Sequence, residues 1–309
     1  MSFHGETVSE DGCWKCDATR QAMADTSACL IESSKRAPSR CHSLGMSDAR
    51  QVVLIHGNWS RGEQLGAARA AFEERGFTAQ TPTLRYHELP IHEGAMKVAS
   101  LSLRDYVDDL VAFVNSLESP PLLVGHSMGG LLAQLVAART RHIGLVAACP
   151  APASGITGSS TPANRRMSRS YFLRLRPWAK PVYPPTFEQL RLWVANTQTE
   201  DTAREIHEGL VCDSGRAQCE MLLAMLKLSK ATVVDAAAVK TPVLVIGGQC
   251  DRIVPAEVLR QTAAQYQRAD IVQMPGSDHM VFSGASLPIT MGHIDDWLIK
   301  NQLISAAPN

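Results

Sequence analysis

The stretch Gly125-His-Ser-Met-Gly129 places a serine between two glycines, after an apolar run and before a helix-forming segment. This G-x-S-x-G pattern is typical of a sharp strand-to-helix turn that presents a serine hydroxyl above a sheet. The serine needs a strained backbone there, and side chains two positions before and after it would collide with the packed strand and helix. We therefore predict that Ser127 is a nucleophile.

A serine hydroxyl is a weak nucleophile near neutral pH unless a base removes its proton. His279 follows the last predicted strand, and Asp251 follows the strand before it. The chain order Ser, Asp, His is the order found with this kind of turn. We predict that His279 is the base and that Asp251 orients its imidazole. Asp278 is a rival acid, but a residue adjacent to the histidine should point elsewhere.

A tetrahedral intermediate needs two preorganised N–H donors for its oxyanion. We expect one to be the backbone N–H of Met128, at the start of the predicted helix. The second should come from the loop after the first strand, His56-Gly-Asn-Trp59. Glycine in this loop lets the backbone approach the oxyanion, so Asn58 or Trp59 would donate. We interpret His56 as a structural hydrogen-bonding residue.

Other side chains could contact a substrate. The candidates for the pocket are Trp59, His126, Tyr86 and Trp178. Residues 165–180 also contain a basic stretch. We interpret it as a solvated face; the alternative is that it attracts an anionic substrate. Its residues are Arg165, Arg166, Arg169, Arg174, Arg176 and Lys180.

The composition is that of a soluble globular protein: 309 residues, 45% hydrophobic and 19% charged. The 30 basic residues balance the 30 acidic residues, so the whole chain has no net positive field to attract a nucleic acid or an anionic membrane. No apolar run reaches about eighteen residues, and the N-terminal residues lack the apolar region of a secretory signal. We expect a cytoplasmic protein without membrane insertion; a homodimer stays open.

Four of the eight cysteines lie in the first fifty residues, and one pair there has the redox or zinc spacing, Cys13-Trp-Lys-Cys16. It lacks the strand–helix context of a redox motif, and Cys29 and Cys41 are not a close second pair for zinc. Without a secretory signal, we expect reduced thiols. The sequence implies no metal and no organic cofactor, with zinc at this pair as the alternative.

Short apolar runs alternate with amphipathic stretches after residue 50. The runs predict strands at 51–56, 77–81, 122–124, 143–148, 243–246 and 271–274. Helical spacing predicts helices at 61–75, 103–117, 128–139, 256–266 and 287–300. This order indicates an α/β fold: a mostly parallel central sheet of about six strands with helices on both faces.

Two segments do not follow this alternation of strands and helices. Residues 1–46 show no periodicity, so we expect a disordered extension, with Met46 as a hypothetical true start. Residues 151–240 contain several prolines, no good strand and three predicted helices near 186–196, 199–210 and 216–228. We expect them to form a helical cap inserted after the strand at 143–148, on a core made of 47–150 and 241–309.

The chain resembles the α/β-hydrolase superfamily, in its capped branch of esterases, C–C bond hydrolases and perhydrolases. The resemblance covers roughly 50–300 and rests on His56-Gly57, the Ser127 motif, Gly248 to Asp251, and His279. Two extra strands that often precede the His-Gly strand are missing here, which suggests a trimmed sheet. A serine in the turn argues against epoxide hydrolases and dehalogenases, whose nucleophile is a carboxylate.

The resemblance implies a serine carboxylesterase that cleaves a small or medium ester, its small-molecule acyl substrate, through an acyl-enzyme. Three alternatives stay open: hydrolysis of a C–C bond in a 1,3-dicarbonyl compound, a hydroxynitrile-lyase-type elimination, and a ligand receptor or pseudoenzyme on the same fold. The segment 151–240 would decide among substrates.

Overall fold

The computed structural model describes residues 50–224 and 226–304. The predicted extension at 1–46, with its C-x-x-C pair, lies outside the described residues.

The centre of the described chain is a six-stranded sheet in the order β2-β1-β3-β4-β7-β8, with every neighbouring pair parallel. The predicted α/β sheet of about six strands is therefore confirmed. Its strands are β1 (Arg50–Ile55), β2 (Phe77–Gln80), β3 (Leu122–His126), β4 (Gly144–Ala148), β7 (Val243–Gly248) and β8 (Ala269–Met274).

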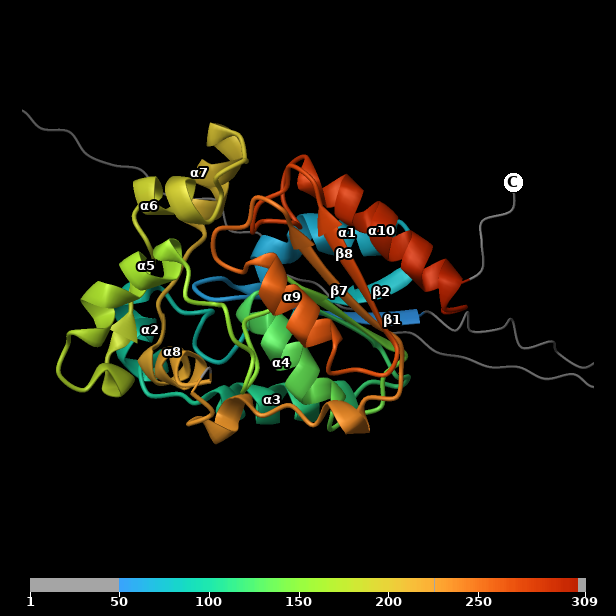
Figure 1. Ribbon diagram of the computed structural model, residues 1–309, viewed down its shortest axis with the longest axis horizontal. Helices are drawn as coiled ribbons and strands as arrows, with labels where there is room; N and C mark the ends of the chain where they lie inside the picture. Colours follow the sequence, from blue (N-terminus) through green and yellow to red (C-terminus); the bar gives the residue numbers. More distant parts are fainter. Residues whose placement is uncertain (1–49, 225, 305–309) are drawn as a thin grey trace, which may run out of the picture. The chain divides into compact units, whose positions relative to one another are not determined.

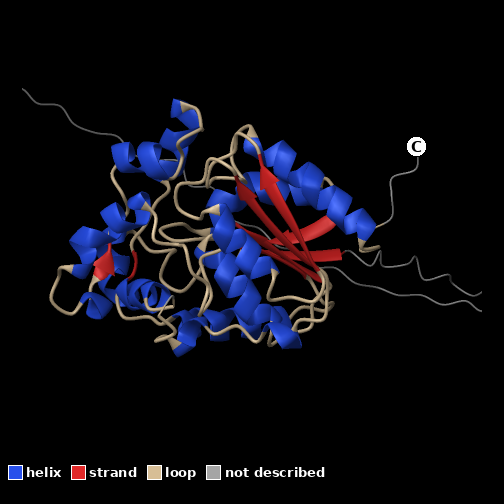
Figure 2. Cartoon of the chain, viewed as in Figure 1, coloured by secondary structure: helices blue, strands red, loops and turns tan. Residues whose placement is uncertain are grey.

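Helices cover both faces of the sheet, because alternate strand residues point to opposite sides. In β1, Val52 and Leu54 pack into the layer with α1 (Gly66–Glu73) and α10 (Ser286–Lys300). Val53 and Ile55 pack into the other, with α3 (Leu103–Asn115), α4 (Met128–Ala137) and α9 (Ala256–Ala263). Ala95 and Val98 of α2 (Ile91–Val98) extend the same apolar cluster beyond the sheet (Figure 1). Figure 1 and Figure 2 show the sheet between these layers.

Local sequence sets where several helices begin and end. The short 3-10 helix η1 (Gly62–Leu65) precedes α1, and Gly76, with φ +78°, ends that segment in the left-handed region. Ser102 and Asp105 form a capping box at the start of α3, and Glu220 accepts a further hydrogen bond from the Ser102 hydroxyl. The helix α2 was not predicted, since Gly94 interrupts its apolar spacing.

Between β4 and β7 the chain adds a mainly helical segment. Its elements are α5 (Pro162–Phe172), η2 (Pro177–Ala179), β5 (Pro181–Val182), α6 (Phe187–Trp193), α7 (Glu200–Glu208), β6 (Asp213–Ser214), α8 (Gly215–Leu222), η3 (Lys230–Thr232) and η4 (Ala236–Ala238). The three predicted helices correspond to α6, α7 and α8.

Two features of this segment correct the sequence analysis. The segment was expected to contain no good strand, but β5 and β6 pair in antiparallel fashion; two-residue strands are too short to leave a period-2 pattern. The helix α5 was not predicted, because polar residues, mainly arginine and serine, make up most of it.

The parallel sheet brings four loops to one edge. The loops after β1, β3, β7 and β8 all leave the carboxyl ends of parallel strands at this edge, where such folds bind ligands. The residues predicted to do chemistry lie in these loops. Within the described residues, every helix is too short or too polar to cross a lipid bilayer.

Candidate active site

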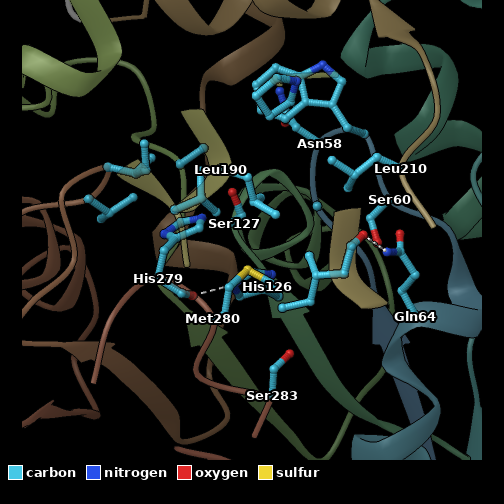
Figure 3. A pocket seen from close by; sticks show the side chains of 18 of the residues that line it. Asn58, Ser60, Gln64, His126, Ser127, Leu190, Leu210, His279, Met280 and Ser283 are labelled. Carbon is cyan, nitrogen blue, oxygen red and sulfur yellow. Dashed lines mark hydrogen bonds between the residues drawn. The ribbon is translucent and has the colours of Figure 1, made fainter. Parts of the chain in front are cut away.

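Ser127 occupies the turn between β3 and α4 with φ 57° and ψ −121°, a conformation that L residues rarely adopt. Its N–H donates to the carbonyl of Ala148 at 2.9 Å, and its own carbonyl accepts from the N–H of Ala151 at 2.9 Å. These bonds to the end of β4 hold the strained backbone in place. The side chain points into a cavity (Figure 3).

Close backbone contacts explain the glycines of this turn. A Cβ atom at Gly125 would lie 2.1 Å from the carbonyl oxygen of Gly129, and one at Gly129 would lie 2.1 Å from that of Ile55. A Cβ atom at Gly57 would lie 2.8 Å from the Cβ of Ser127. The loop after β1 therefore passes directly beside the serine, as the sequence analysis expected.

His279 and Asp251 meet from the loops after β8 and β7. The Nδ1–H of His279 donates to Oδ2 of Asp251 at 2.8 Å, and both side chains are buried. The other oxygen, Oδ1, accepts from the N–H groups of Ile253 at 2.7 Å and Val254 at 2.9 Å. With Nδ1 engaged, Nε2 is the nitrogen of His279 that is left to accept a proton.

The pairing of Asp251 with His279 favours the charged form of each: the pKa of Asp251 is lowered and that of His279 is raised. Burial alone would raise the pKa of Asp251, but the charge and hydrogen bond of His279 and the two backbone N–H groups lower it. Burial alone would lower the pKa of His279, but the charge and hydrogen bond of Asp251, with a smaller contribution from Asp278, raise it. Asp251 thus stabilises an imidazolium at His279.

His126, beside the serine, supports the loop that carries His279. Its Nε2–H donates to the backbone carbonyl of His279 at 2.8 Å, and the ring centroids lie 4.9 Å apart. Burial and the neighbouring His279 lower the pKa of His126 to about 4. His126 is therefore neutral at physiological pH and positions its neighbour.

Asp278, the rival acid, points away from the imidazole of His279. Its Oδ1 accepts from Nε2 of Gln198 at 2.9 Å, and its Oδ2 accepts from the N–H of Thr197 at 2.7 Å. It connects the loop of His279 to the residues between α6 and α7. Sequence reasoning had foreseen the direction of this side chain but not its partners.

The backbone N–H groups of Asn58 and Trp59 were the two candidates for the second oxyanion donor, and only one of them is already bound in the structure. The N–H of Trp59 donates to Oδ2 of Asp213 at 2.9 Å, and its carbonyl accepts from the N–H of Val211 at 2.7 Å. The prediction of Trp59 as an oxyanion donor is therefore wrong, because a buried carboxylate already holds that N–H. Asn58, which lines the cavity, remains the expected donor of this loop, and the N–H of Met128 is the first of α4.

Asp213 was missed by sequence reasoning, since Cys212-Asp-Ser214 carries no motif. Its carboxylate is buried, accepts a second N–H from Ser214 at 2.6 Å, and lies 3.6 Å from Nε2 of His87. Burial opposes its ionisation, but His87 and the two backbone N–H groups lower its pKa. It holds the backbone of Trp59, whose φ is +59°, in the left-handed region next to Asn58.

His56 has the structural role that its position suggested. Its Nδ1–H donates to the carbonyl of Gly57 at 2.9 Å, and its Nε2 accepts the N–H of Leu84 at 3.0 Å. Burial, and then the nearby His87, lower the pKa of His56 to about 3. It is neutral and joins the loops after β1 and β2.

Among the described residues, His126, Cys149 and His279 bring possible metal-ligand atoms within 4.8 Å of one another. One nitrogen of each histidine is already engaged, with the carbonyl of His279 and with Asp251. Burial, and then the Asp251 charge, raise the pKa of the Cys149 thiol, whereas ligation requires the thiolate. The cluster fits a hydrogen-bonded histidine–carboxylate pair better than a metal centre.

A cavity of about 720 Å³ opens over Ser127 and His279 (Figure 3). Its walls come from the loop after β1 and the loop after β8 on one side, and from α5, α6, α7 and α8 on the other. Of the predicted pocket residues, Trp59 and His126 line it. Tyr86 and Trp178 do not: Tyr86 packs against the core, and Trp178 is 54% exposed to solvent.

Comparison with known proteins gives one family match. The model of the "Alpha/beta hydrolase family" matches residues 52–285, more than half of the chain. No curated protein sequence matches this chain.

Several solved structures share the fold. A monoacylglycerol lipase of Paleococcus ferrophilus is 22% identical, with a TM-score of 0.60 over 81% of this chain and 94% of its own. A pyrethroid hydrolase from Sphingobium faniae JZ-2 is 17% identical, with a TM-score of 0.58 over 80% and 97%. A thermophilic esterase from Thermogutta terrifontis is 20% identical, with a TM-score of 0.57 over 81% and 90%. At these identities the likeness concerns the fold.

Proposed function

Because the chain belongs to the alpha/beta hydrolase family, we propose that it hydrolyses carboxylic esters of small or medium size through an acyl-enzyme at Ser127. The observation that carries this proposal is the buried 2.8 Å hydrogen bond between His279 and Asp251, beside the cavity that Ser127 lines. Named esterases and lipases with the same fold support the choice of an ester.

The reaction would use each group in turn. Oγ of Ser127 attacks the ester carbon while Nε2 of His279 takes its proton, and Asp251 stabilises the imidazolium. The N–H groups of Met128 and Asn58 donate to the oxyanion. Collapse of this intermediate expels the alcohol, which receives the proton from His279. Water, deprotonated by the same nitrogen, then releases the acid and restores the serine.

We assign residues 151–240 the part of a cap over this site, as the sequence analysis expected. Residues of this segment supply about half of the lining, including Leu190 of α6 and Leu210 after α7. A cavity of about 720 Å³ lies within the range of roughly 300–1,000 Å³ that small-molecule sites occupy. Substrate choice would then depend on the cap, and the chemistry on the core.

The proposal is tested by labelling the protein with a fluorophosphonate and assaying a panel of p-nitrophenyl esters of increasing acyl length. We expect one label per chain, located on Ser127 by peptide mass spectrometry, and turnover of short and medium esters. Labelling without turnover of any ester, together with cleavage of a 1,3-diketone or a cyanohydrin, would replace the ester proposal by one of the alternatives.

The contact between Asp213 and the loop after β1 leads to a prediction about the oxyanion. Asp213→Asn keeps the size of the side chain but removes the charge that holds the N–H of Trp59. Loss of one oxyanion donor costs about a hundredfold to a thousandfold in kcat. In this variant the N–H of Asn58, next to Trp59, would only be displaced, so kcat should fall by about tenfold to a hundredfold. The change should appear in kcat, with KM nearly unchanged.

The matched control is Asp235→Asn, at an exposed carboxylate of the same segment. It should keep the kcat of the parent protein. Thermal unfolding of both variants separates a displaced donor from a loss of folded protein. An Asp213→Asn variant with full kcat would contradict the positioning role of Asp213.

A further inference from the structure

The segment that connects α5 to β5, residues 173–180, exposes large apolar side chains. Leu173 is 78% exposed, Leu175 is 85% exposed and Trp178 is 54% exposed. Single exposed leucines are ordinary, but three large apolar residues within six positions are not. Tyr183, just beyond, is 53% exposed. In Figure 1 this segment follows α5 at the left edge, away from the sheet.

Cations alternate with these apolar residues. Arg174, Arg176 and Lys180 are all exposed, and in the described chain none of them has a carboxylate within salt-bridge distance. The sequence contains no aspartate or glutamate between Glu118 and Glu188. The adjoining helix α8 brings Glu220, but that carboxylate is bound by Arg216 and by Ser102. The local charge is therefore positive, although the whole chain is neutral.

The backbone of this segment is anchored at both ends. The helix α5 precedes it, and β5, paired with β6, follows it; between them η2 packs against α8. Arg176 has φ +54°, in the left-handed region, and thereby turns the chain before Pro177. The leucines and arginines thus lie on a short segment that is held at both ends.

We propose that residues 173–180 dock this protein on the surface of a lipid bilayer that contains anionic lipids. Leucine and tryptophan side chains enter the boundary between headgroups and acyl chains, where tryptophan and tyrosine are enriched. The arginines and the lysine remain at the level of the anionic headgroups, with their aliphatic stems against the apolar region. An acidic protein partner would satisfy the cations but would leave Leu173 and Leu175 without a comparable apolar environment.

Docking would place the cavity next to the membrane. Arg165 and Arg169 of α5 line the cavity, and residues 173–180 directly follow this helix. This inference does not rest on the proposed ester hydrolysis, because binding is measured without substrate.

The test is flotation of the full chain with phosphatidylcholine vesicles, with and without 30% phosphatidylserine. We expect binding only to the anionic vesicles, weakened by 0.5 M NaCl. Each cation at such a surface contributes about fivefold to binding, so the triple variant R174E/R176E/K180E should bind at least a hundredfold more weakly. The variant L173A/L175A, with its charges intact, should bind about tenfold more weakly.

The control is R141E/K240E/R268E, which makes the same change of charge at exposed residues that precede β4, β7 and β8. It should bind like the parent protein, and thermal unfolding should show that all variants fold. Three results would overturn the proposal. The first is no binding to anionic vesicles, and the second is an equal loss of binding in the control. The third is binding of L173A/L175A equal to that of the parent protein, together with full competition by soluble polyglutamate.

Discussion

Ser127→Ala should lower kcat for any ester that the protein hydrolyses by about three to six powers of ten. The substitution removes the oxygen that attacks the substrate and leaves the other groups in place. The remaining rate would come from the oxyanion donors and from water activated by His279. Because the side chain points into a cavity, the loss of one oxygen should not disturb folding. Single-turnover and steady-state kinetics measure the effect.

Two controls accompany this experiment: a substitution at another serine, and labelling of the Ser127→Ala variant. Ser116→Ala alters an exposed serine at the end of α3 that does not line the cavity, and it should keep full activity. Ser127→Ala should also fail to react with a fluorophosphonate. If this variant kept a rate near that of the parent protein, the whole assignment of the site would be wrong.

Asp251→Asn should lower kcat by about three to four powers of ten and also move the pH profile. His279 must be neutral to act as a base, so activity should rise with pH through its pKa. The charge of Asp251 raises that pKa above the ordinary value. Without this charge the pKa falls, and the acidic limb of kcat/KM should move to lower pH while its plateau drops.

Asp278→Asn discriminates between the two neighbouring acids. Asp278 also raises the pKa of His279, but as a smaller contributor and without contact to the ring. Its variant should shift the acidic limb less than Asp251→Asn does and should retain far more activity. His126, with a pKa of about 4, does not compete for the inflection that His279 sets. An equal shift in both variants would contradict the assignment of Asp251.

The sheet and the chemical groups were predictable because each leaves a local signal. A buried parallel strand needs an unbroken apolar run, and the serine turn needs Gly125 and Gly129, since a Cβ atom at either would overlap the backbone. Asp251 and His279 could be found because they follow the last two strands of the sheet.

The remaining features depend on contacts that are distant in sequence. The bond from Trp59 to Asp213 joins residues 154 positions apart, and nothing local marks either partner. For the same reason the pocket could not be read from aromatic residues: Trp59 lines it, whereas Trp178 faces solvent. The neutral total charge likewise concealed the positive segment at 173–180, because the compensating carboxylates lie elsewhere.

The hydrogen bonds that join the helical segment to the core determine how this segment could be exchanged between relatives. Examples are the bond that Asp213 accepts from Trp59 and those that Asp278 accepts from Thr197 and Gln198. Each joins the segment to a loop of the catalytic core. A chimera that grafts a foreign 151–240 segment would inherit a new specificity only if these positions were transplanted with compatible partners. Modular recombination in this fold is therefore constrained wherever hydrogen bonds join the segment to the core.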